Sequence, residues 1–434
     1  MWLGSADLHT GATGNCVDAE DFGSKNSGHG LRSGSTVRCT SCPLFAEEWQ
    51  LVNDGVIPVL WLCGPPGVGK TTVGWELYAE LVRSGIQTGY IDIDQLGVCY
   101  PEAESDRGRH RMKARNLGAV VAGHRAAGAR CVVVSGVVDA DHGVNIDELP
   151  HMGLTVCRLR ADQEDLAQRF VGRRGQAEGL EQVLQEAADL DASAVADVCV
   201  DTSGLTVGEV ALRVRERAGG WPVLTDSGRS SVAAEPGRGQ AVADGIGSGF
   251  DLAVPVLWLC GATGVGKSTV GFQVYLKVLH GGLTAAYIDL DQLGFCGPTP
   301  ADHQVKARNL AGMWRTYREA GAQALVIVGP VEDESAVSVY ADALPAATLT
   351  VCRLHAGRNE LTGRIMLRGQ GGSWSQPGDP LVGQPATHLL RIAAQAAHDA
   401  DALEQSAIGH RIDTNGRTVE EITDMVFTQT AWLP

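Results

Sequence analysis

The chain has 434 residues, of which 44% are hydrophobic and 20% charged, a balance typical of globular domains with ample core. Its formal charge of −16 opposes a generic role in nucleic-acid binding, because such binding depends on clustered Lys and Arg that neutralise phosphates. No apolar run approaches the roughly 18 residues of a membrane helix, and the first residues lack the basic and then apolar order of a signal peptide. We therefore expect a cytoplasmic protein of two or three domains, without a membrane or nucleic-acid partner.

The first 50 residues form a segment of low hydrophobicity. They are rich in Gly, Ser, Asn and Thr and cannot bury enough apolar area to offset chain entropy, so 1–50 is predicted to be a mobile leader. Its Cys39 and Cys42 form a single CxxC after Cys16. A zinc site requires a second cysteine pair or histidines at ligand spacing, so we expect no metal there. Six further cysteines lie in apolar runs and are expected to be reduced core residues: Cys63, Cys131, Cys157, Cys199, Cys260 and Cys352.

The stretch 64–72, GPPGVGKTT, follows an apolar run over 58–63 and precedes a helical pattern over 70–84. A strand, a glycine-rich loop and a helix in this order bind phosphate, because backbone N–H groups converge in the loop and the helix N-terminus adds its positive dipole end. In this P-loop pattern the lysine reaches the outer phosphates and the next hydroxyl takes magnesium. We predict a nucleotide site with Lys70 catalytic and Thr71 a magnesium ligand, formed by Gly64, Gly67, Gly69, Lys70, Thr71 and Thr72.

Two carboxylates follow at the end of the next strand, which is predicted over 89–93. Residues two apart in an extended strand share a face, so Asp92 and Asp94 can point at one site beyond the P-loop. We predict that both are catalytic: Asp92 organises magnesium and its waters, and Asp94 accepts a proton from, or orients, a substrate hydroxyl. The alternative is a turn pair that only caps a loop.

The helix predicted over 109–127 carries candidate acceptor contacts. Arg115 and Asn116 lie in the segment KARNL, and His110 comes just before it. A substrate with an anionic group would suit a pocket that contains Arg115, His110 and Lys113, since a charge-assisted hydrogen bond contributes about 1.5 to 3 kcal/mol. Because the apolar positions of this helix face the sheet, Arg115 and Asn116 could instead be ordinary surface groups.

The remaining elements complete an alternating order. Further strands are predicted over 130–135, 153–159 and 197–201, and further helices over 162–173 and 205–217. Strands that alternate with helices predict an α/β fold, a parallel sheet covered by helices on both faces, with ligands at the carboxyl ends of the strands. Arg169 and Arg173 of the helix over 162–173 are predicted catalytic residues, because arginines on a mobile lid can close over the transferring phosphoryl group. A solvated basic face is the alternative.

The chain then repeats itself. PVLWLCG over 58–64 returns over 255–261, and YIDIDQLGVC over 90–99 returns as YIDLDQLGFC over 287–296, both shifted by 197 residues (261 − 64). KARNL returns after a shift of 193 (306 − 113). A near-constant offset of this length indicates a duplicated domain. We expect tandem domains over 51–218 and 251–434, a flexible linker over 219–250 and a loop insertion near 369–385.

The second copy repeats the predicted site residues. Its nucleotide-binding residues are Gly261, Gly264, Gly266, Lys267, Ser268 and Thr269, with Ser268 and Asp289 as magnesium ligands and Asp291, Arg308 and Asn309 on the acceptor side. Arg160 is replaced by His355 and Arg174 by Gly369, a loss of lid charge that weakens transition-state stabilisation more than nucleotide binding. The first domain is therefore the expected main active site, and the second is active, selective for another substrate, or regulatory.

Together these motifs resemble the small P-loop kinases typified by adenylylsulfate kinase, gluconate kinase and shikimate kinase, over about 55–217 and less completely over 252–428. The resemblance implies two P-loop NTPase domains of the nucleoside-monophosphate-kinase-like fold. It implies a loop around adenine at Asp201 and Thr202, with ATP and magnesium as cofactors. It also implies transfer of the γ-phosphoryl group to a hydroxyl of a small metabolite.

Two other functions stay open. An ATP-binding switch or partner-binding protein would have the same P-loops, with phosphoryl transfer slow or absent. A polynucleotide 5′-hydroxyl kinase would require a basic channel, which a formal net charge of −16 does not favour. In either case the two domains are expected to pair within the chain as a pseudo-dimer.

Overall fold

The structure is a computed structural model that describes residues 56–174, 178–224, 253–331, 333–372, 379, 381–406 and 408–433. We refer to 56–224 as the first half of the described chain and to 253–433 as the second half. The predicted leader over 1–50, with its CxxC, lies outside the described residues, as do most of the predicted linker and the centre of the predicted insertion. Within the described ranges, no helix is both long enough and apolar enough to span a membrane.

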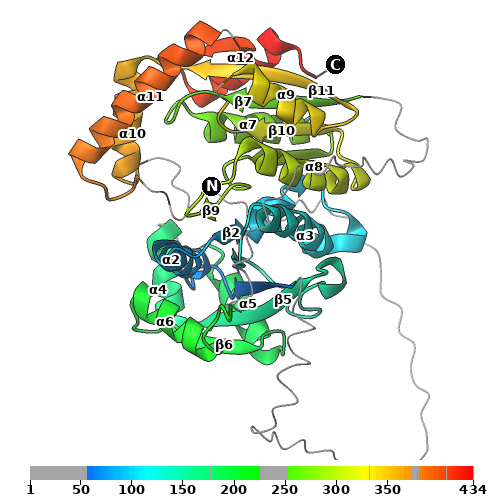
Figure 1. Cartoon of the computed structure of the whole chain (residues 1–434), viewed down its shortest axis with the longest axis vertical. Coiled ribbons are helices and arrows are strands. Elements are labelled where there is room, and N and C mark those ends of the chain that lie inside the picture. The colour runs from blue at the N-terminus through cyan, green and yellow to red at the C-terminus, as the bar shows by residue number, and fades with distance from the viewer. Residues whose placement is uncertain are drawn as a thin grey trace, which may run out of the picture. The chain divides into compact units, whose positions relative to one another are not determined.

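The first half follows the predicted order of strands and helices (Figure 1). Its strands are β1 (Ile57–Cys63), β2 (Thr88–Asp92), β3 (Cys99–Tyr100), β4 (Cys131–Ser135), β5 (Met152–Arg160) and β6 (Val198–Asp201). Its α-helices are α2 (Lys70–Arg83), α3 (His110–Ala126), α4 (Gln163–Arg174), α5 (Leu180–Ala192) and α6 (Val207–Arg217). Three short 3₁₀ helices are η1 (Ile93–Gly97), η2 (Glu104–Arg109) and η3 (Ile146–Glu148). The predicted strands and helices are confirmed, and α5 is a helix that the sequence analysis missed.

The second half has a closely similar order of elements. Its strands are β7 (Val254–Cys260), β8 (Ala285–Asp289), β9 (Cys296–Gly297), β10 (Ala324–Val328), β11 (Ala347–His355) and β12 (His410–Asp413). Its helices are α7 (Lys267–His280), α8 (His303–Glu319), α9 (Glu334–Asp342), α10 (Arg358–Gly369), α11 (Ala386–Ser406) and α12 (Val419–Thr430). The helix α9 has no counterpart of comparable length in the first half, where only η3 lies between β4 and β5.

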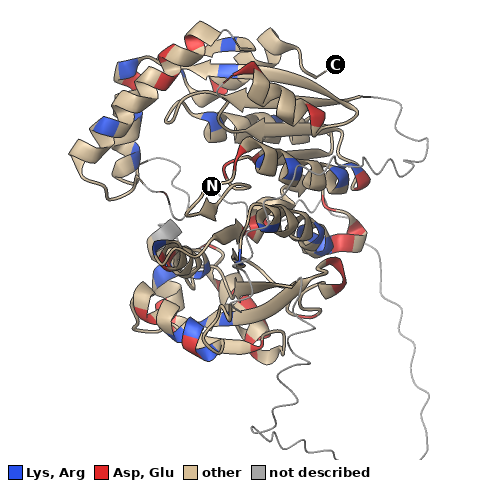
Figure 2. Ribbon diagram, viewed as in Figure 1, with Lys and Arg blue, Asp and Glu red and all other residues tan. Residues whose placement is uncertain are grey.

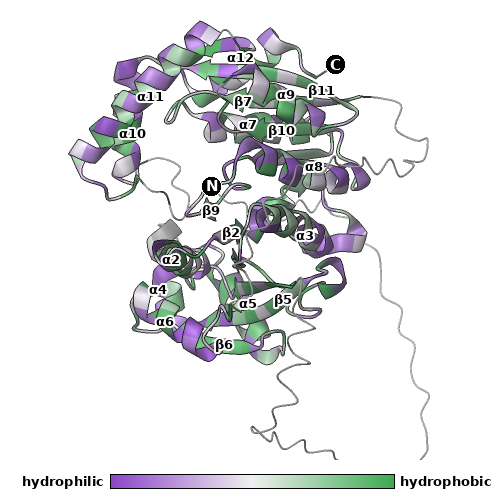
Figure 3. Ribbon diagram, in the orientation of Figure 1, coloured by the Kyte–Doolittle hydropathy of each residue, from purple (hydrophilic) through white to green (hydrophobic). Residues whose placement is uncertain are grey.

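Each half contributes five strands to a six-stranded sheet. The order is β6-β5-β1-β4-β2-β9 in one sheet and β12-β11-β7-β10-β8-β3 in the other, and the five strands from one half run parallel. These strands are mostly hydrophobic (Figure 3), while charged residues lie mainly on helices and loops (Figure 2). Near-continuous apolar strands suit a parallel sheet, because both of its faces are buried. The predicted α/β class with helices on both faces is confirmed.

The central strand β1 shows how both faces are covered. Its alternate residues Val59 and Trp61 pack in one core cluster, with α3, while Leu60 and Leu62 pack in another, with α2 and α6. Successive side chains of a strand point to opposite faces, so the two clusters are the two faces of one sheet. The P-loop follows β1 at its carboxyl end, between these two layers.

The two halves exchange their short strands. At the outer edge of each sheet, β9 of the second half pairs antiparallel with β2, and β3 of the first half pairs antiparallel with β8. Helices α3 and α8 are in contact, and one core cluster contains buried residues of both halves, among them Trp61 and Trp258. The strand that carries each acidic pair is therefore closed at its edge by a strand of the other half, which covers backbone groups that an edge would expose.

Two further observations adjust sequence-based expectations. Trp221 lies in the stretch predicted as linker, yet it is 3% exposed and packs in the core of the first half, so that the described chain stays folded at least to this residue. Cys199 was expected in the core but is exposed on β6, the outermost strand, where one face of the sheet is only partly covered. The other cysteines of the described ranges are free and buried.

Candidate functional site

The P-loop of the first half joins β1 to α2 with a backbone that only glycine adopts without strain. Gly64 has φ 140°, and a Cβ there would lie 2.4 Å from the carbonyl oxygen of Leu159. Gly69 caps α2 with φ 101°, and no side chain caps the first turn of that helix. The first N–H groups of a helix have no partner within the helix, so this end of α2 offers unpaired donors and a positive dipole to an anion.

Lys70 lies over the loop that it follows. Its Nζ donates to the carbonyl oxygens of Gly64, at 2.7 Å, and Pro65, at 3.0 Å. Burial lowers the pKa of Lys70, and the nearby carboxylate of Asp94 opposes this shift. The ammonium group is thus held at the mouth of the loop on carbonyl oxygens, where phosphate oxygens would be stronger acceptors for the same donors.

The acidic pair lies next to this lysine, but its geometry differs from the predicted one. The strand β2 ends at Asp92, and Asp94 lies in the 3₁₀ helix η1, so the two residues do not share a strand face. They are close because the Asp92 carboxylate caps η1 and accepts from the Asp94 N–H at 3.0 Å. The alternative of a capping pair is therefore correct for Asp92, and it coexists with the placement of both carboxylates near Lys70.

The environment of Asp92 favours a cation. Burial, and then repulsion by Asp94, raises the pKa of Asp92 to about 7. In the second half the same causes raise the pKa of Asp289 to about 6, and Ser268 Oγ donates to Asp289 at 3.2 Å. A hydroxyl beside a carboxylate at a helix N-terminus fits magnesium, which typically takes one or two protein ligands together with substrate phosphates. The described residues include no group of three or more metal-ligating side chains.

Asp94 has a cationic partner from α3. Lys113 Nζ donates to Asp94 Oδ1 at 2.9 Å, and the side chains are only 6% and 18% exposed, respectively. The sequence pattern predicts Lys113 only as a neighbour of Arg115 in the acceptor pocket, not as the partner of Asp94. Lys113 is the fourth residue of α3 and lies on the same side of this helix as His110, its first residue. It is therefore near the carboxyl ends of the strands.

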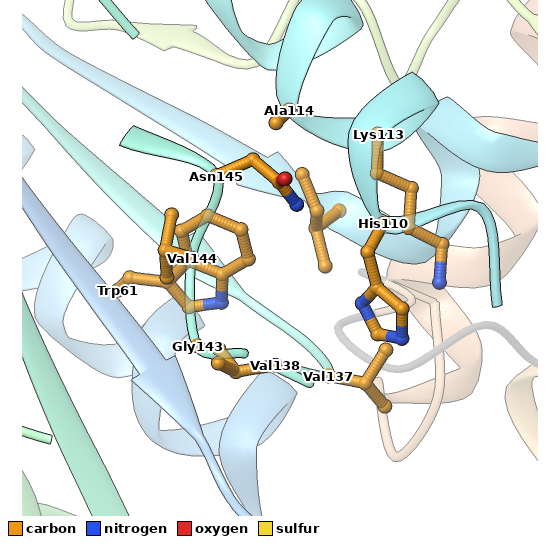
Figure 4. A pocket seen from close by; sticks show the side chains of 10 residues that line it. Trp61, His110, Lys113, Ala114, Val137, Val138, Gly143, Val144 and Asn145 are labelled. Carbon is orange, nitrogen blue, oxygen red and sulfur yellow. The ribbon is translucent and has the colours of Figure 1, made fainter. Parts of the chain in front are cut away.

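A small cavity of about 10 Å³, room for about one water molecule, lies beside Lys113 (Figure 4). Trp61 of β1 lines one side, and His110 and Lys113 of α3 line the other, as Figure 4 shows. The loop after β4 contributes further walls, and the complete lining is Trp61, Ile93, His110, Lys113, Ala114, Val137, Val138, Gly143, Val144 and Asn145. Burial, and then the charge of Lys113, lowers the pKa of His110, so that its imidazole is neutral near pH 7.

The structure corrects the expectation for Arg115. Its guanidinium forms ion pairs with Glu148, at 3.1 Å, and with Glu319 of α8, at 2.8 Å. It borders a surface hollow beside Ile57 and Met152, at the amino ends of β1 and β5, so it lies away from the P-loop end of the sheet. Arg308 of the second half is likewise exposed.

Asn116 is also away from the cavity, for a different reason. It is fully buried, and its Nδ2 donates to the carbonyl oxygen of Leu96 in η1 at 2.6 Å. Asn309 makes the same contact with Leu293 at 2.9 Å. Both asparagines therefore hold the turn that carries the acidic pair, which is a positioning role instead of the predicted acceptor contact.

The lid arginine Arg169 ties α4 to the loop after β6. It donates to Thr202 Oγ1 at 2.8 Å and to the Thr202 carbonyl oxygen at 2.9 Å, while Asp201 pairs with Arg160. Arg364 makes matching contacts with Thr414 in the second half. That Arg169 closes over a phosphoryl group stays a prediction. The side chain of Arg173 lies outside the described residues.

Several cavity residues were missed from the sequence. Trp61 lies in an apolar run that predicts only a core strand, and Val137, Val138 and Asn145 lie in a loop without a motif. The signal that could have pointed to Trp61 is its position three residues before the first glycine of the P-loop, at the carboxyl end of the central strand, where ligands bind in such sheets.

Part of the chain is similar to known proteins. Residues 60–188 match the family model of the AAA domain, whereas no curated protein matches the chain in sequence. Similar solved structures include a gluconokinase from Sinorhizobium meliloti 1021, with 21% identity, a TM-score of 0.27 and coverage of 38% of this chain and 91% of that one. A tunicamycin resistance protein from Deinococcus radiodurans has 20% identity and a TM-score of 0.30, covering 38% and 96% of the two chains.

A shikimate kinase from Acinetobacter baumannii, in complex with shikimate, has 21% identity, a TM-score of 0.25 and coverage of 37% of this chain and 93% of that one. Similarity at this level does not carry an activity over to this chain. The family match falls on the strand, glycine loop and helix described above and supports a P-loop domain over residues 60–188.

Proposed function

We propose that the chain is an ATP- and magnesium-dependent kinase that transfers the γ-phosphoryl group to a hydroxyl of a small metabolite, with its main active site in the first half. The cavity between Trp61 and His110 carries this proposal, because it is lined by Lys113, the partner of Asp94, and by Trp61 near the carboxyl end of β1, the strand that leads into the P-loop. Phosphoryl transfer between two small substrates requires a place for the acceptor beside the phosphate-binding loop, and this cavity, now the size of about one water molecule, would widen to take it.

The roles of the residues follow from their positions. Lys70 and the first N–H groups of α2 bind the outer phosphates, and Thr71 with Asp92 would hold magnesium, which neutralises developing charge when bound. Asp94 accepts the proton of the acceptor hydroxyl, and Lys113 fixes the direction of its carboxylate. The neutral His110 and the Lys113 ammonium favour an acceptor that is polyhydroxylated or carries an anionic group.

The test is a screen of phosphoryl acceptors. The full chain is incubated with Mg·ATP and a panel of sugar acids, polyols and hydroxylated ring acids, including gluconate and shikimate, and ADP formation is measured. We expect acceptor-dependent ADP formation that Asp94→Asn abolishes, while calorimetry with Mg·ADP still detects binding. Asp189→Asn, at an exposed carboxylate on α5, is the control. If no panel member stimulates ADP formation above the level without acceptor, the kinase proposal is contradicted.

A nucleotide-dependent switch is the second candidate, and the exchanged strands β3 and β9 favour it. We propose, with either function, that 51–218 and 251–434 act as two domains paired as an internal pseudo-dimer, since each sheet is completed by a strand from the other half. A switch would show no transfer to any acceptor, but Mg·ATP would change hydrogen exchange in β3 and β9 where Mg·ADP would not.

A further inference from the structure

The position of the first-half cavity is filled in the second half. In the first half, Trp61 and His110 face the cavity from β1 and α3 (Figure 4). The matching residues are Trp258, shifted by 197 (258 − 61), and His303, shifted by 193 (303 − 110), on β7 and α8. The ring of Tyr340 packs edge-on against both, with ring centroids 4.8 Å from Trp258 and 5.6 Å from His303.

Tyr340 is a fixed part of that packing. It is 1% exposed, and its hydroxyl lies 3.0 Å from His303 Nδ1. It belongs to α9, the helix without a counterpart of comparable length in the first half. A buried aromatic ring held on two sides and by a hydrogen bond excludes any other molecule from its place.

Register identifies the first-half residue that matches Tyr340. The next strands, β5 from Met152 and β11 from Ala347, each have nine residues and are offset by 195 (347 − 152). The same offset relates Tyr340 to Asn145 (340 − 195), which lines the cavity. A short polar side chain in the first half thus corresponds to the aromatic plug of the second.

Trp61 and Trp258 differ in whether the indole N–H has a hydrogen-bond partner. Trp61 Nε1 is buried and has no hydrogen-bond partner among the described residues, whereas Trp258 Nε1 donates to the Gly329 carbonyl oxygen at 3.4 Å. In Figure 4 the Trp61 indole nitrogen lies on the cavity side of its ring. A buried donor without a partner is costly, so this N–H favours an acceptor oxygen in the cavity. At the matching position of the second half, the Trp258 N–H is already paired and is not free for a ligand.

The nucleotide side of the second half, in contrast, is complete. Lys267 Nζ donates to the carbonyl oxygens of Gly261 and Ala262 at 2.8 and 3.1 Å, and Ser268 contacts Asp289. We infer that the second half binds a nucleoside triphosphate but is closed to phosphoryl acceptors by Tyr340, and that the exchange of Asn145 for Tyr340 decides which half transfers phosphate. This inference rests on the proposed kinase function.

Water can serve as the acceptor probe, because it enters any open acceptor cavity. A water oxygen then attacks the γ-phosphorus, the bond from that phosphorus to the bridging oxygen breaks, and ADP, inorganic phosphate and a proton are released. The full chain is incubated with Mg·ATP alone, and phosphate release is followed. Binding stoichiometry is measured separately by calorimetry with Mg·ADP.

The matched variants are Lys70→Ala, Lys70→Ala with Tyr340→Asn, Lys70→Ala with Tyr340→Phe, and Asn145→Tyr. Lys70→Ala is expected to bind one ADP per chain and to release phosphate at less than a twentieth of the wild-type rate. Adding Tyr340→Asn is expected to raise that rate at least fivefold, whereas Tyr340→Phe, which keeps the ring, is expected to leave it unchanged. Asn145→Tyr is expected to lower the wild-type rate at least tenfold with both ADP sites kept.

Three outcomes would overturn the inference. Lys70→Ala that retains about half of the wild-type rate would show a catalytic second half, and Lys70→Ala that binds no ADP would remove its nucleotide site. A folded Lys70→Ala/Tyr340→Asn variant without a gain in rate would show that Tyr340 is not the barrier. The first two results do not depend on the folding of any Tyr340 variant. A wild type that neither releases phosphate nor uses any acceptor would instead contradict the proposed function itself.

Discussion

The two halves are alike where they would meet a nucleotide and different where they would meet an acceptor. The P-loop lysines contact the same two loop carbonyls at 2.7 and 3.0 Å in the first half and at 2.8 and 3.1 Å in the second. The lysine on the acidic pair, however, lies 2.9 Å from Asp94 but 3.5 Å from Asp291, and Asp291 is 53% exposed where Asp94 is 18% exposed. Phosphate binding uses backbone groups of a local loop, whereas the acceptor side depends on side chains from several elements, so it can change while the loop stays the same.

The largest expected effect separates the two acidic pairs. Asp94→Asn is expected to lower acceptor phosphorylation at least 100-fold, because a positioned general base typically contributes about 10²- to 10⁴-fold. Asp291→Asn is expected to lower it less than threefold, since Tyr340 fills the adjoining position in that half. Steady-state kinetics with the acceptor found in the screen provide the measurement. Equal losses of acceptor phosphorylation in the two variants would show that both halves are catalytic, which contradicts the proposed difference between them.

The next expected effect concerns nucleotide affinity, where the halves are predicted to behave alike. Lys70→Ala and Lys267→Ala each remove donors to the outer phosphates, and charge-assisted hydrogen bonds contribute about 1.5 to 3 kcal/mol each. Each variant is therefore expected to weaken one site by roughly 10-fold or more and to reduce the Mg·ATP stoichiometry from two to one by calorimetry. A wild type that binds one nucleotide would show that the second P-loop does not act as a site.

The sequence predicted the local features of this molecule well and the long-range features poorly. The P-loop and the strands follow from short patterns, because their geometry is set by neighbouring residues. The acidic pair was located by the same kind of pattern, but its geometry was not predicted, because Asp94 lies in η1 and not on the strand. Arg115 and Asn116 show the limit: they are adjacent in α3, but successive helix positions face different directions, so one forms surface ion pairs and the other is buried against Leu96. The cavity residue Asn145 and the exchanged strands β3 and β9 depend on contacts between distant segments, which no local pattern contains.

A smaller effect tests the reciprocal contacts between the halves. His124 Nε2 lies 3.2 Å from the Leu293 carbonyl oxygen, and Tyr317, the matching residue after a shift of 193 (317 − 124), donates to the Leu96 carbonyl oxygen at 3.0 Å. Each residue thus supports, from the other half, the turn that carries an acidic pair. Since burial lowers the pKa of His124 to about 4, its ring stays neutral in the folded chain and donates from Nε2.

These two contacts respond differently to pH. The unfolded chain binds a proton at His124 near its ordinary pKa of about 6.5, and the folded chain does so only near 4, so stability is lost as pH falls through this window. Between pH 7.5 and 5.5 the loss is about 1 kcal/mol from this group. His124→Gln is expected to remove that part of the pH dependence in urea unfolding. Tyr317→Phe is expected to lower stability by about 1 kcal/mol at every pH, and identical slopes for wild type and His124→Gln would contradict this account.

The smallest expected effect is at Arg115, the residue that the sequence made most prominent on the acceptor side. Its side chain is 43% exposed and pairs with Glu148 and Glu319, and exposed ion pairs typically contribute about 0 to 1 kcal/mol each. Because it lies toward the amino ends of the strands, Arg115→Ala is expected to change the KM of the acceptor less than threefold and the unfolding free energy by about 1 kcal/mol or less. His110→Ala, in the cavity, is expected to raise the KM of the acceptor at least tenfold under the same assay. Should Arg115→Ala raise KM as strongly as His110→Ala, the acceptor would bind between α3 and α8, and the comparison of Asn145 with Tyr340 would lose its basis.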